Sequence, residues 1–285
     1  MHNSPQPPPP PERAAPLVRA SLAVHIGAAG VALLRPRLWP WALAAVVADH
    51  LLLTAAGLWP RSQLLGPNWT RLPGDPSDSD IAITIDDGPD PEVTGSVLEL
   101  LDQHAARATF FCVGERIVRY PQLAAEITQR GHEIGNHSYR HLKRFSLLGP
   151  RGLADEVGRA QQAISAASGA VPRFFRAPAG LRNPFLEPVL ARANLRLVSW
   201  TRRGFDTVNT SPARVLARLT RNLGGGDILL LHDGHAARTT GGVPVILAVL
   251  PALLMAIKEA GLVPVTLSSA LPPRQPAALS AAQPP

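Results

Sequence analysis

Residues 81–89 read Ile-Ala-Ile-Thr-Ile-Asp-Asp-Gly-Pro, a short apolar run followed at once by two carboxylates and a turn. The β-branched residues of the run predict a buried strand, and Asp-Asp-Gly-Pro predicts the turn that ends it. A helical stretch opens near Pro91, because proline suits the first turn of a helix, and extends to Leu101. This unit, a strand followed by a helix, sets the fold of the chain downstream.

The same strand and helix pattern repeats as far as residue 267. Further strands are expected at 108–113, 133–136, 173–175, 195–200, 227–231 and 262–267. Such alternation is typical of parallel strands joined by crossover helices. We therefore expect an α/β fold, a distorted (β/α) barrel of about seven parallel strands, closed or nearly closed.

Composition divides the whole chain into five parts. Residues 1–16 contain five consecutive prolines and are predicted to form a disordered arm. Residues 17–60 are apolar and are predicted to form a helical hairpin. A linker is expected at 61–79, the α/β domain at 80–270 and a disordered tail at 271–285.

The hairpin would consist of two apolar segments, 20–34 and 38–59, separated by a short basic turn. Spanning the hydrocarbon core of a bilayer takes about 20 residues, and three tryptophans lie near the ends of the second segment, where interfacial aromatics are found. We therefore predict a membrane hairpin of two hydrophobic helices. Two buried helices of a soluble extension are the alternative, which Asp49 in mid-segment favours because a charge inside a bilayer is costly.

The net charge of +7 comes almost entirely from arginine. No recognised nucleic-acid motif accompanies this charge and aromatic residues make up only 5% of the chain, so we predict no nucleic-acid partner. Anionic phospholipid headgroups or a phosphate-bearing glycan carrier fit better. We expect a bacterial-type inner (cytoplasmic) membrane location; the arginines around the hairpin give only a small bias toward a cytoplasmic domain.

Three groups of polar residues follow predicted strands: Asp86-Asp87, the pair His137 and His141, and His232. The carboxyl ends of barrel strands meet at one rim, so we expect these side chains to lie together. Two histidines at i, i+4 can chelate one metal ion, and two adjacent aspartates add a hard ligand with a spare carboxylate. This set predicts metal-assisted hydrolysis, although each motif alone is also compatible with an ordinary turn or a solvated helix face.

Four motifs occur in order along the chain: 84–89 (TIDDGP), 137–141 (HSYRH), 176–180 (RAPAG) and 231–233 (LHD). Together they resemble the successive motifs of the polysaccharide deacetylase family, a carbohydrate esterase family that carries the NodB homology domain. The resemblance covers about 81–267 and leaves the apolar segments outside it. Four motifs in family order are a far stronger signal than any one of them.

The resemblance implies a role for each matching residue. Asp87, His137 and His141 would be the ligands of a divalent metal ion, which in this family is usually zinc. Asp86 would be the general base that deprotonates the attacking water. His232 would be the general acid that protonates the departing amine.

Three further residues follow from the resemblance. Arg176 would hold Asp86 in its ionised form, and Asp206, in the segment 200–206 (WTRRGFD), would pair with the acid histidine. The backbone N–H of Ala179 would hold the oxyanion. Alanine replaces the aromatic residue that the family often has at this position, and the motif around Asp206 is looser than usual, which makes Asp206 the least secure of these residues.

The sequence thus predicts a membrane-tethered, metal-dependent hydrolase that removes the N-acetyl group of an amino sugar in a polysaccharide or cell-envelope glycan. A deacetylase or deformylase acting on a lipid-linked sugar precursor is the alternative that the hairpin favours. An inactive, membrane-anchored glycan-binding homologue is a second alternative. The expected partners are an N-acetylated glycan or lipid-linked sugar and the membrane.

Overall fold

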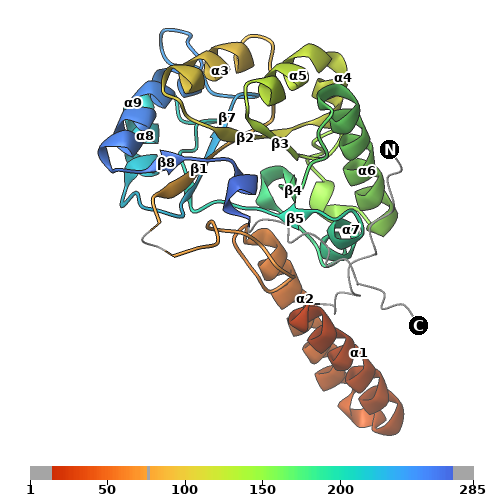
Figure 1. The fold of residues 1–285 in the computed structure, drawn as a ribbon. Helices are drawn as coiled ribbons and strands as arrows, with labels where there is room; N and C mark the ends of the chain where they lie inside the picture. The colour runs from red at the N-terminus through yellow and green to blue at the C-terminus, as the bar shows by residue number, and fades with distance from the viewer. Residues whose placement is uncertain (1–14, 76–77, 272–285) are drawn as a thin grey trace, which may run out of the picture.

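The computed structural model describes residues 15–75 and 78–271. Nearly all of the predicted arm, 1–16, and of the predicted tail, 271–285, therefore lies outside the described residues. Figure 1 shows a rounded α/β domain from which a pair of long antiparallel helices projects.

A parallel sheet forms the centre of the domain, with the strand order β5-β4-β3-β2-β1-β7-β6 and with β8 paired to the start of β1. The strands are β1 (Asp80–Asp86), β2 (Ala108–Cys112), β3 (Glu133–Asn136), β4 (Phe174–Phe175), β5 (Arg196–Leu197), β6 (Arg202–Arg203), β7 (Ile228–His232) and β8 (Val263–Pro264). The seven strands of the main path curl into a half-barrel (Figure 1). The predicted α/β fold of parallel strands is confirmed.

The structure differs from the sequence prediction in the expected strand 195–200. The expected strand contains the short strand β5, and β6 follows just beyond residue 200. These two strands lie at opposite ends of the sheet, so residues 198–201 cross its open side. Trp69 pairs with the crossing segment: its N–H donates to Leu197 O at 2.9 Å and its carbonyl accepts from Ser199 N at 2.7 Å. A residue from the expected linker therefore closes the half-barrel where no full strand is available.

Helices cover the outer face of the sheet (Figure 1). They are α3 (Thr94–Gln103), α4 (Gly114–Arg119), α5 (Pro121–Gln129), α6 (Pro150–Ser168), α7 (Leu186–Arg192), α8 (Pro212–Thr220) and α9 (Val245–Glu259). The first of these begins at Thr94 and not near Pro91 as expected, because residues 91–93 form a turn before it. The expected strand 262–267 is also shorter, and a 3-10 helix, η4 (Leu267–Ala270), takes up its end.

Alternate residues of β1 face two different layers, as strand geometry requires. Ile81, Ile83 and Ile85 pack with the helices in the larger core. Ala82 belongs to a second cluster on the inner face of the sheet. Asp86 continues that inner face, so the strand delivers its last carboxylate to the inside of the half-barrel.

The predicted hairpin is confirmed as two helices, α1 (Pro16–Leu34) and α2 (Trp39–Leu58), joined by the 3-10 helix η1 (Pro36–Leu38). By length and composition each helix could cross a membrane, with mean hydropathies of 1.8 and 1.6. Asp49 is buried between them and accepts a 2.7 Å hydrogen bond from Ser21 Oγ. Their large apolar side chains point outward, so the two helices do not form a buried soluble core.

The end of α2 is fixed to the domain by hydrogen bonds. The carbonyl of Gly57 accepts from Arg182 N at 3.1 Å, and the carbonyl of Pro60 accepts from Ser199 Oγ at 2.5 Å. Arg182 follows the 3-10 helix η3 (Pro178–Gly180), and Ser199 belongs to the crossing segment. The hairpin therefore meets the domain at loops from two distant parts of the sequence.

His132 gives the fold a defined pH dependence. It is only 5% exposed, its Nδ1 accepts a hydrogen bond from Ala108 N at 3.3 Å, and burial together with the nearby Arg107 lowers its pKa to about 4. Because protonation is disfavoured in the folded state, the free energy of unfolding should decrease as the pH falls from 6.5 through 4. The loss should reach up to about 3 kcal/mol, from about 1.4 kcal/mol per pKa unit.

Denaturant titrations at pH 7.5 and 4.5 would measure this loss. A His132→Phe variant should lose less stability between the two pH values than the wild type. The matched control is His104→Phe, because His104 is exposed at the end of α3 and its Nδ1 lies 3.0 Å from the carbonyl of Leu100. An equal loss in His132→Phe and wild type would show that His132 is not responsible.

Candidate active site

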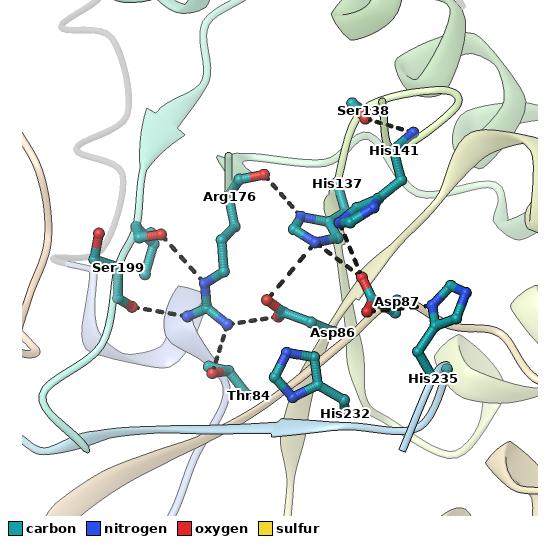
Figure 2. A network of polar contacts seen from close by, with 12 residues as sticks. Thr84, Asp86, Asp87, His137, Ser138, His141, Arg176, Ser199, His232 and His235 are labelled. Carbon is teal, nitrogen blue, oxygen red and sulfur yellow. Dashed lines mark hydrogen bonds and ion pairs between the residues drawn. The ribbon is translucent and has the colours of Figure 1, made fainter. Parts of the chain in front are cut away.

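The carboxyl end of β1 carries Asp86 and Asp87, and the strand register places Asp86 beside His232 at the end of β7. His137 follows β3 directly, and His141 lies four residues further along the chain. Figure 2 shows these side chains converging from strands that are far apart in sequence. The structure thus brings the main sequence candidates to one rim of the half-barrel.

Arg176 holds Asp86 inside the half-barrel. Its guanidinium donates to Asp86 Oδ1 at 2.6 Å and to Thr84 Oγ1 at 2.8 Å, and it is 1% exposed (Figure 2). It also donates to the backbone carbonyl of Ser199 at 2.8 Å. The guanidinium therefore fixes the position of the buried carboxylate and balances its charge.

Asp87, His137 and His141 have the geometry of a metal site. One ligand atom from each lies within 4.8 Å of the other two, and Asp87 Oδ1 lies 3.2 Å from the Nε2 atoms of both histidines. This oxygen is buried and has no hydrogen-bond partner among the described residues. His137 Nδ1 lies 2.8 Å from the carbonyl of Arg176 and must donate to it, which leaves the lone pair of Nε2 directed at the same point. The donor set therefore fits a divalent cation.

The electrostatic surroundings of Asp87 and His141 favour the forms of these two side chains that bind metals. Burial would raise the pKa of Asp87, but contacts with His137, His235 and His141 outweigh it and hold that pKa well below its usual range. Burial and the nearby His137 lower the pKa of His141 to about 4, so its imidazole is neutral at pH 7. An ionised carboxylate and a neutral imidazole are the forms that bind metals.

His232 is paired with Asp206, as the resemblance implied. Its Nδ1 lies 2.9 Å from Asp206 Oδ1, and its backbone N–H donates to Asp206 Oδ2 at 2.7 Å. Burial lowers the pKa of His232, but the hydrogen bond and charge of Asp206, together with the nearby Asp86 and Asp87, raise it above its ordinary value. Asp206 is fully buried, and both of its carboxylate oxygens are engaged by His232.

Strained backbone is concentrated in the loops of this site. Non-glycine residues with a left-handed φ in these loops are Asp87, Ser138, His141, Ala179, Phe205 and His235. Such conformations cost free energy and persist where the surrounding structure enforces them, commonly at functional sites. At Ala179 the φ of 54° leaves a backbone N–H that bonds to no acceptor in the described part of the chain, beside the cavity that this residue lines.

Comparison with known proteins agrees with this geometry. The profile described as polysaccharide deacetylase matches residues 74–198. A peptidoglycan-N-acetylglucosamine deacetylase from Bacillus cereus is 35% identical over 193 residues, which cover 67% of this chain and 87% of the relative. The chain belongs to the polysaccharide deacetylase family. A chitooligosaccharide deacetylase from Bradyrhizobium is 36% identical over 156 residues, covering 54% of this chain and 71% of that protein.

Solved structures extend the comparison. A family 4 carbohydrate esterase from Streptomyces lividans, in complex with acetate, is 32% identical, with a TM-score of 0.60 over 66% of this chain and 92% of that one. A family 4 pseudoenzyme from Bacillus anthracis, at 24% identity, shares the fold with a TM-score of 0.63 over 71% of this chain and 68% of that one. The predicted family and the predicted enzyme class, a hydrolase of N-acetyl amide bonds, are confirmed; the roles of individual residues stay predictions.

Two residues of this deacetylase site received no role from the sequence. His235 belongs to none of the four sequence motifs, but its Nδ1 lies 3.5 Å from Asp87 Oδ2 (Figure 2). Asp233 is fully buried, accepts hydrogen bonds from Thr94 Oγ1 at 2.5 Å and Gly234 N at 2.8 Å, and has its pKa raised to about 7, mainly by burial. In the sequence, the only indication that either residue belongs to the site was its position shortly after His232.

The site opens into a cavity of about 550 Å³. Its floor contains the carboxylates and histidines described above, and Ala179, Gly180 and Trp200 form part of its wall. A volume of this size can hold a sugar residue with its substituents, since small-molecule sites span about 300–1,000 Å³. The rest of the wall is mostly charged.

The pair formed by His232 and Asp206 generates a testable pH dependence. Replacing Asp206 with Asn removes the charge that raises the pKa of His232, so the histidine should lose its proton at lower pH. If His232 acts as an acid, the alkaline limb of the profile of kcat/KM against pH should move to lower pH by about one unit. Acetate release measured from pH 5 to 10 would show it, and a uniformly lowered profile of unchanged shape would contradict it.

Proposed function

We propose that this deacetylase removes the N-acetyl group from an amino sugar of a cell-envelope glycan by metal-dependent hydrolysis, with zinc as the metal. The observation that carries the proposal is the placement of two charged pairs, Asp86 with Arg176 and His232 with Asp206, on either side of one ligand set. An amide is cleaved when water loses a proton and the leaving nitrogen gains one, which requires a base and an acid at separate positions. The amino-sugar deacetylases among the relatives support this choice of substrate class.

Asp87, His137 and His141 would hold the ion, which when bound would polarise the acyl carbonyl and lower the pKa of water. The remaining steps belong to this chain's own residues. Asp86 would accept the proton of the attacking water, and Arg176 would hold Asp86 in position through their 2.6 Å contact. The N–H of Ala179 would donate to the carbonyl oxygen as negative charge develops there.

Cleavage of the C–N bond requires a proton on the departing nitrogen. His232 would supply it from Nε2, because Nδ1 is engaged by Asp206. The products are acetate and the free amine of the sugar. One water is consumed for each C–N bond cleaved: its hydroxyl joins the acyl carbon, and the departing nitrogen keeps the proton that it receives. Asp206 thus sets both the tautomer and the acidity of His232.

The hairpin supports a membrane location for this reaction. Both helices are long enough to span a bilayer, and Trp59 at the end of α2 is 58% exposed, in the position where an interfacial aromatic is expected. Asp49 is paired with Ser21 between the helices, which reduces the cost of a carboxylate at that depth. We propose that residues 17–60 anchor the domain in a bacterial-type inner membrane.

The anchor can be tested by extraction. After expression in a bacterium, the full chain should stay in the membrane pellet after an alkaline carbonate wash, because two embedded helices are not released by breaking ionic contacts. Immunoblotting of pellet and supernatant measures the distribution. Release of the chain into the supernatant would contradict a spanning hairpin.

An Asp86→Asn variant tests the catalytic assignment. The amide cannot accept the proton of water, so acetate release from a chitin tetramer should fall by about 10²–10⁴-fold. Metal stoichiometry should be unchanged, because Asp86 is not among the three ligands. The control is Asp87→Asn, which should lose metal and activity together.

Metal analysis and acetate release on the wild type and both variants decide between the proposals. A wild type that binds no metal and releases no acetate would remove the enzyme proposal and favour an inactive glycan-binding homologue. Retained activity in Asp86→Asn would show that another group is the base.

A further inference from the structure

The wall of the active-site cavity carries positive charge that the proposed catalytic roles do not use. The cationic side chains that line it are Arg116, Arg119, Arg140, Lys143 and Arg203. Two of them are neutralised by ion pairs, Arg116 with Asp90 at 3.1 Å and Arg140 with Glu156 at 2.6 Å. Within residues 15–75 and 78–271, the other three lie within ion-pair distance of no carboxylate.

Arg203 is the most firmly held of the three unpaired cations. Its guanidinium lies 5.5 Å from the ring centroid of Trp200 and 4.9 Å from that of Phe205. Its Nε is buried and has no hydrogen-bond partner among the described residues. Two aromatic rings thus orient the guanidinium, and its planar terminal N–H groups match phosphate or carboxylate oxygens.

The same wall touches the end of the hairpin. Gly180 lies between Trp200 and Pro60, and a Cβ at this glycine would come within 2.6 Å of the indole and 2.7 Å of the proline ring. Pro60 is the second residue after α2, and Figure 1 shows α2 meeting the domain near β5 and α7. The cavity wall that presents Arg203 is therefore built against the segment that leaves the apolar helices.

We propose that the amino sugar deacetylated at this site is linked through phosphate to a membrane lipid, and that Arg203 binds that phosphate. This inference rests on the proposed deacetylase function and on the membrane placement of the hairpin. A neutral glycan would leave the three unpaired cations without a counter-charge, whereas a sugar phosphate supplies one next to the reacting ring. A lipid carrier would also confine the sugar to the interface where the hairpin fixes the cavity.

Four acetylated probes distinguish the contribution of the phosphate to kcat/KM from that of the lipid. They are N-acetylglucosamine linked to farnesyl phosphate, the neutral farnesyl glycoside, N-acetylglucosamine 1-phosphate, and the methyl glycoside of N-acetylmuramic acid. The full chain in lipid nanodiscs would be assayed for kcat/KM by acetate release. We expect the farnesyl phosphate probe to exceed the neutral farnesyl glycoside by on the order of tenfold to a hundredfold, as for a charge-assisted hydrogen bond. It should also exceed the probe without lipid.

Variants at Arg203 connect the preference to the residue. Arg203→Gln should reduce the ratio of kcat/KM between the phosphate and neutral farnesyl probes about tenfold, and Arg203→Lys should retain part of it. The matched control is Arg218→Gln. Arg218 packs against the same Phe205 ring at 4.9 Å but is exposed and does not line the cavity, so the ratio should not change.

Three results would overturn the inference: equal kcat/KM for the phosphate and neutral farnesyl probes, a muramic acid glycoside preferred to the farnesyl phosphate probe, or the same ratio in Arg203→Gln as in wild type.

If no probe releases acetate, the proposed function fails, and direct binding of the farnesyl phosphate probe still tests this inference. Weaker binding to Arg203→Gln than to wild type and Arg218→Gln would support it. Equal binding to all three would overturn it.

Discussion

The buried ion pair between Arg176 and Asp86 is the interaction on which the rest of the site depends. Burying two charges is costly, and the cost is offset only when the remaining donors and acceptors are also satisfied. Arg176 meets this condition with hydrogen bonds to Asp86, Thr84 and the carbonyls of Val198 and Ser199. Removing one partner of such a pair costs about 3–5 kcal/mol, so the position of Asp86 is coupled to the stability of the half-barrel.

Arg176 also orders its surroundings through its backbone. Its carbonyl accepts from His137 Nδ1, so one residue fixes Asp86 with its side chain and a metal-ligand candidate with its main chain. Its guanidinium holds the crossing segment, in which Ser199 Oγ donates to the carbonyl of Pro60 at the end of the hairpin. A continuous set of direct contacts therefore runs from the apolar helices to Asp86, and the orientation of the catalytic rim toward the hairpin follows from it.

The parts of this structure that depend on strand order could be predicted from sequence. Asp86 and His232 end the buried strands β1 and β7, and His137 directly follows β3; parallel strands bring their carboxyl ends together whatever the loops do. The segment 195–200 was wrongly expected to be one strand. Its strand ends at Leu197, and only the pairing of β5 with β4 and of β6 with β7 shows that the chain leaves the sheet between them. His235 was missed for a related reason: a loop residue with a φ of 60° reaches Asp87 only through tertiary contacts, which leave no periodic signal.

The fold alone does not specify catalysis, since a pseudoenzyme shares it. The distribution of charge within this site is more informative. Asp86 is balanced by Arg176, and Asp206 is balanced by His232 when that histidine carries its proton. Asp87 differs, because the groups within ion-pair distance of it are the histidines His137, His141 and His235, and its Oδ1 accepts no hydrogen bond among the described residues. Since a buried carboxylate without a fixed balancing charge is unfavourable, this distribution supports the proposal that Asp87 binds a cation while Asp86 acts as the base.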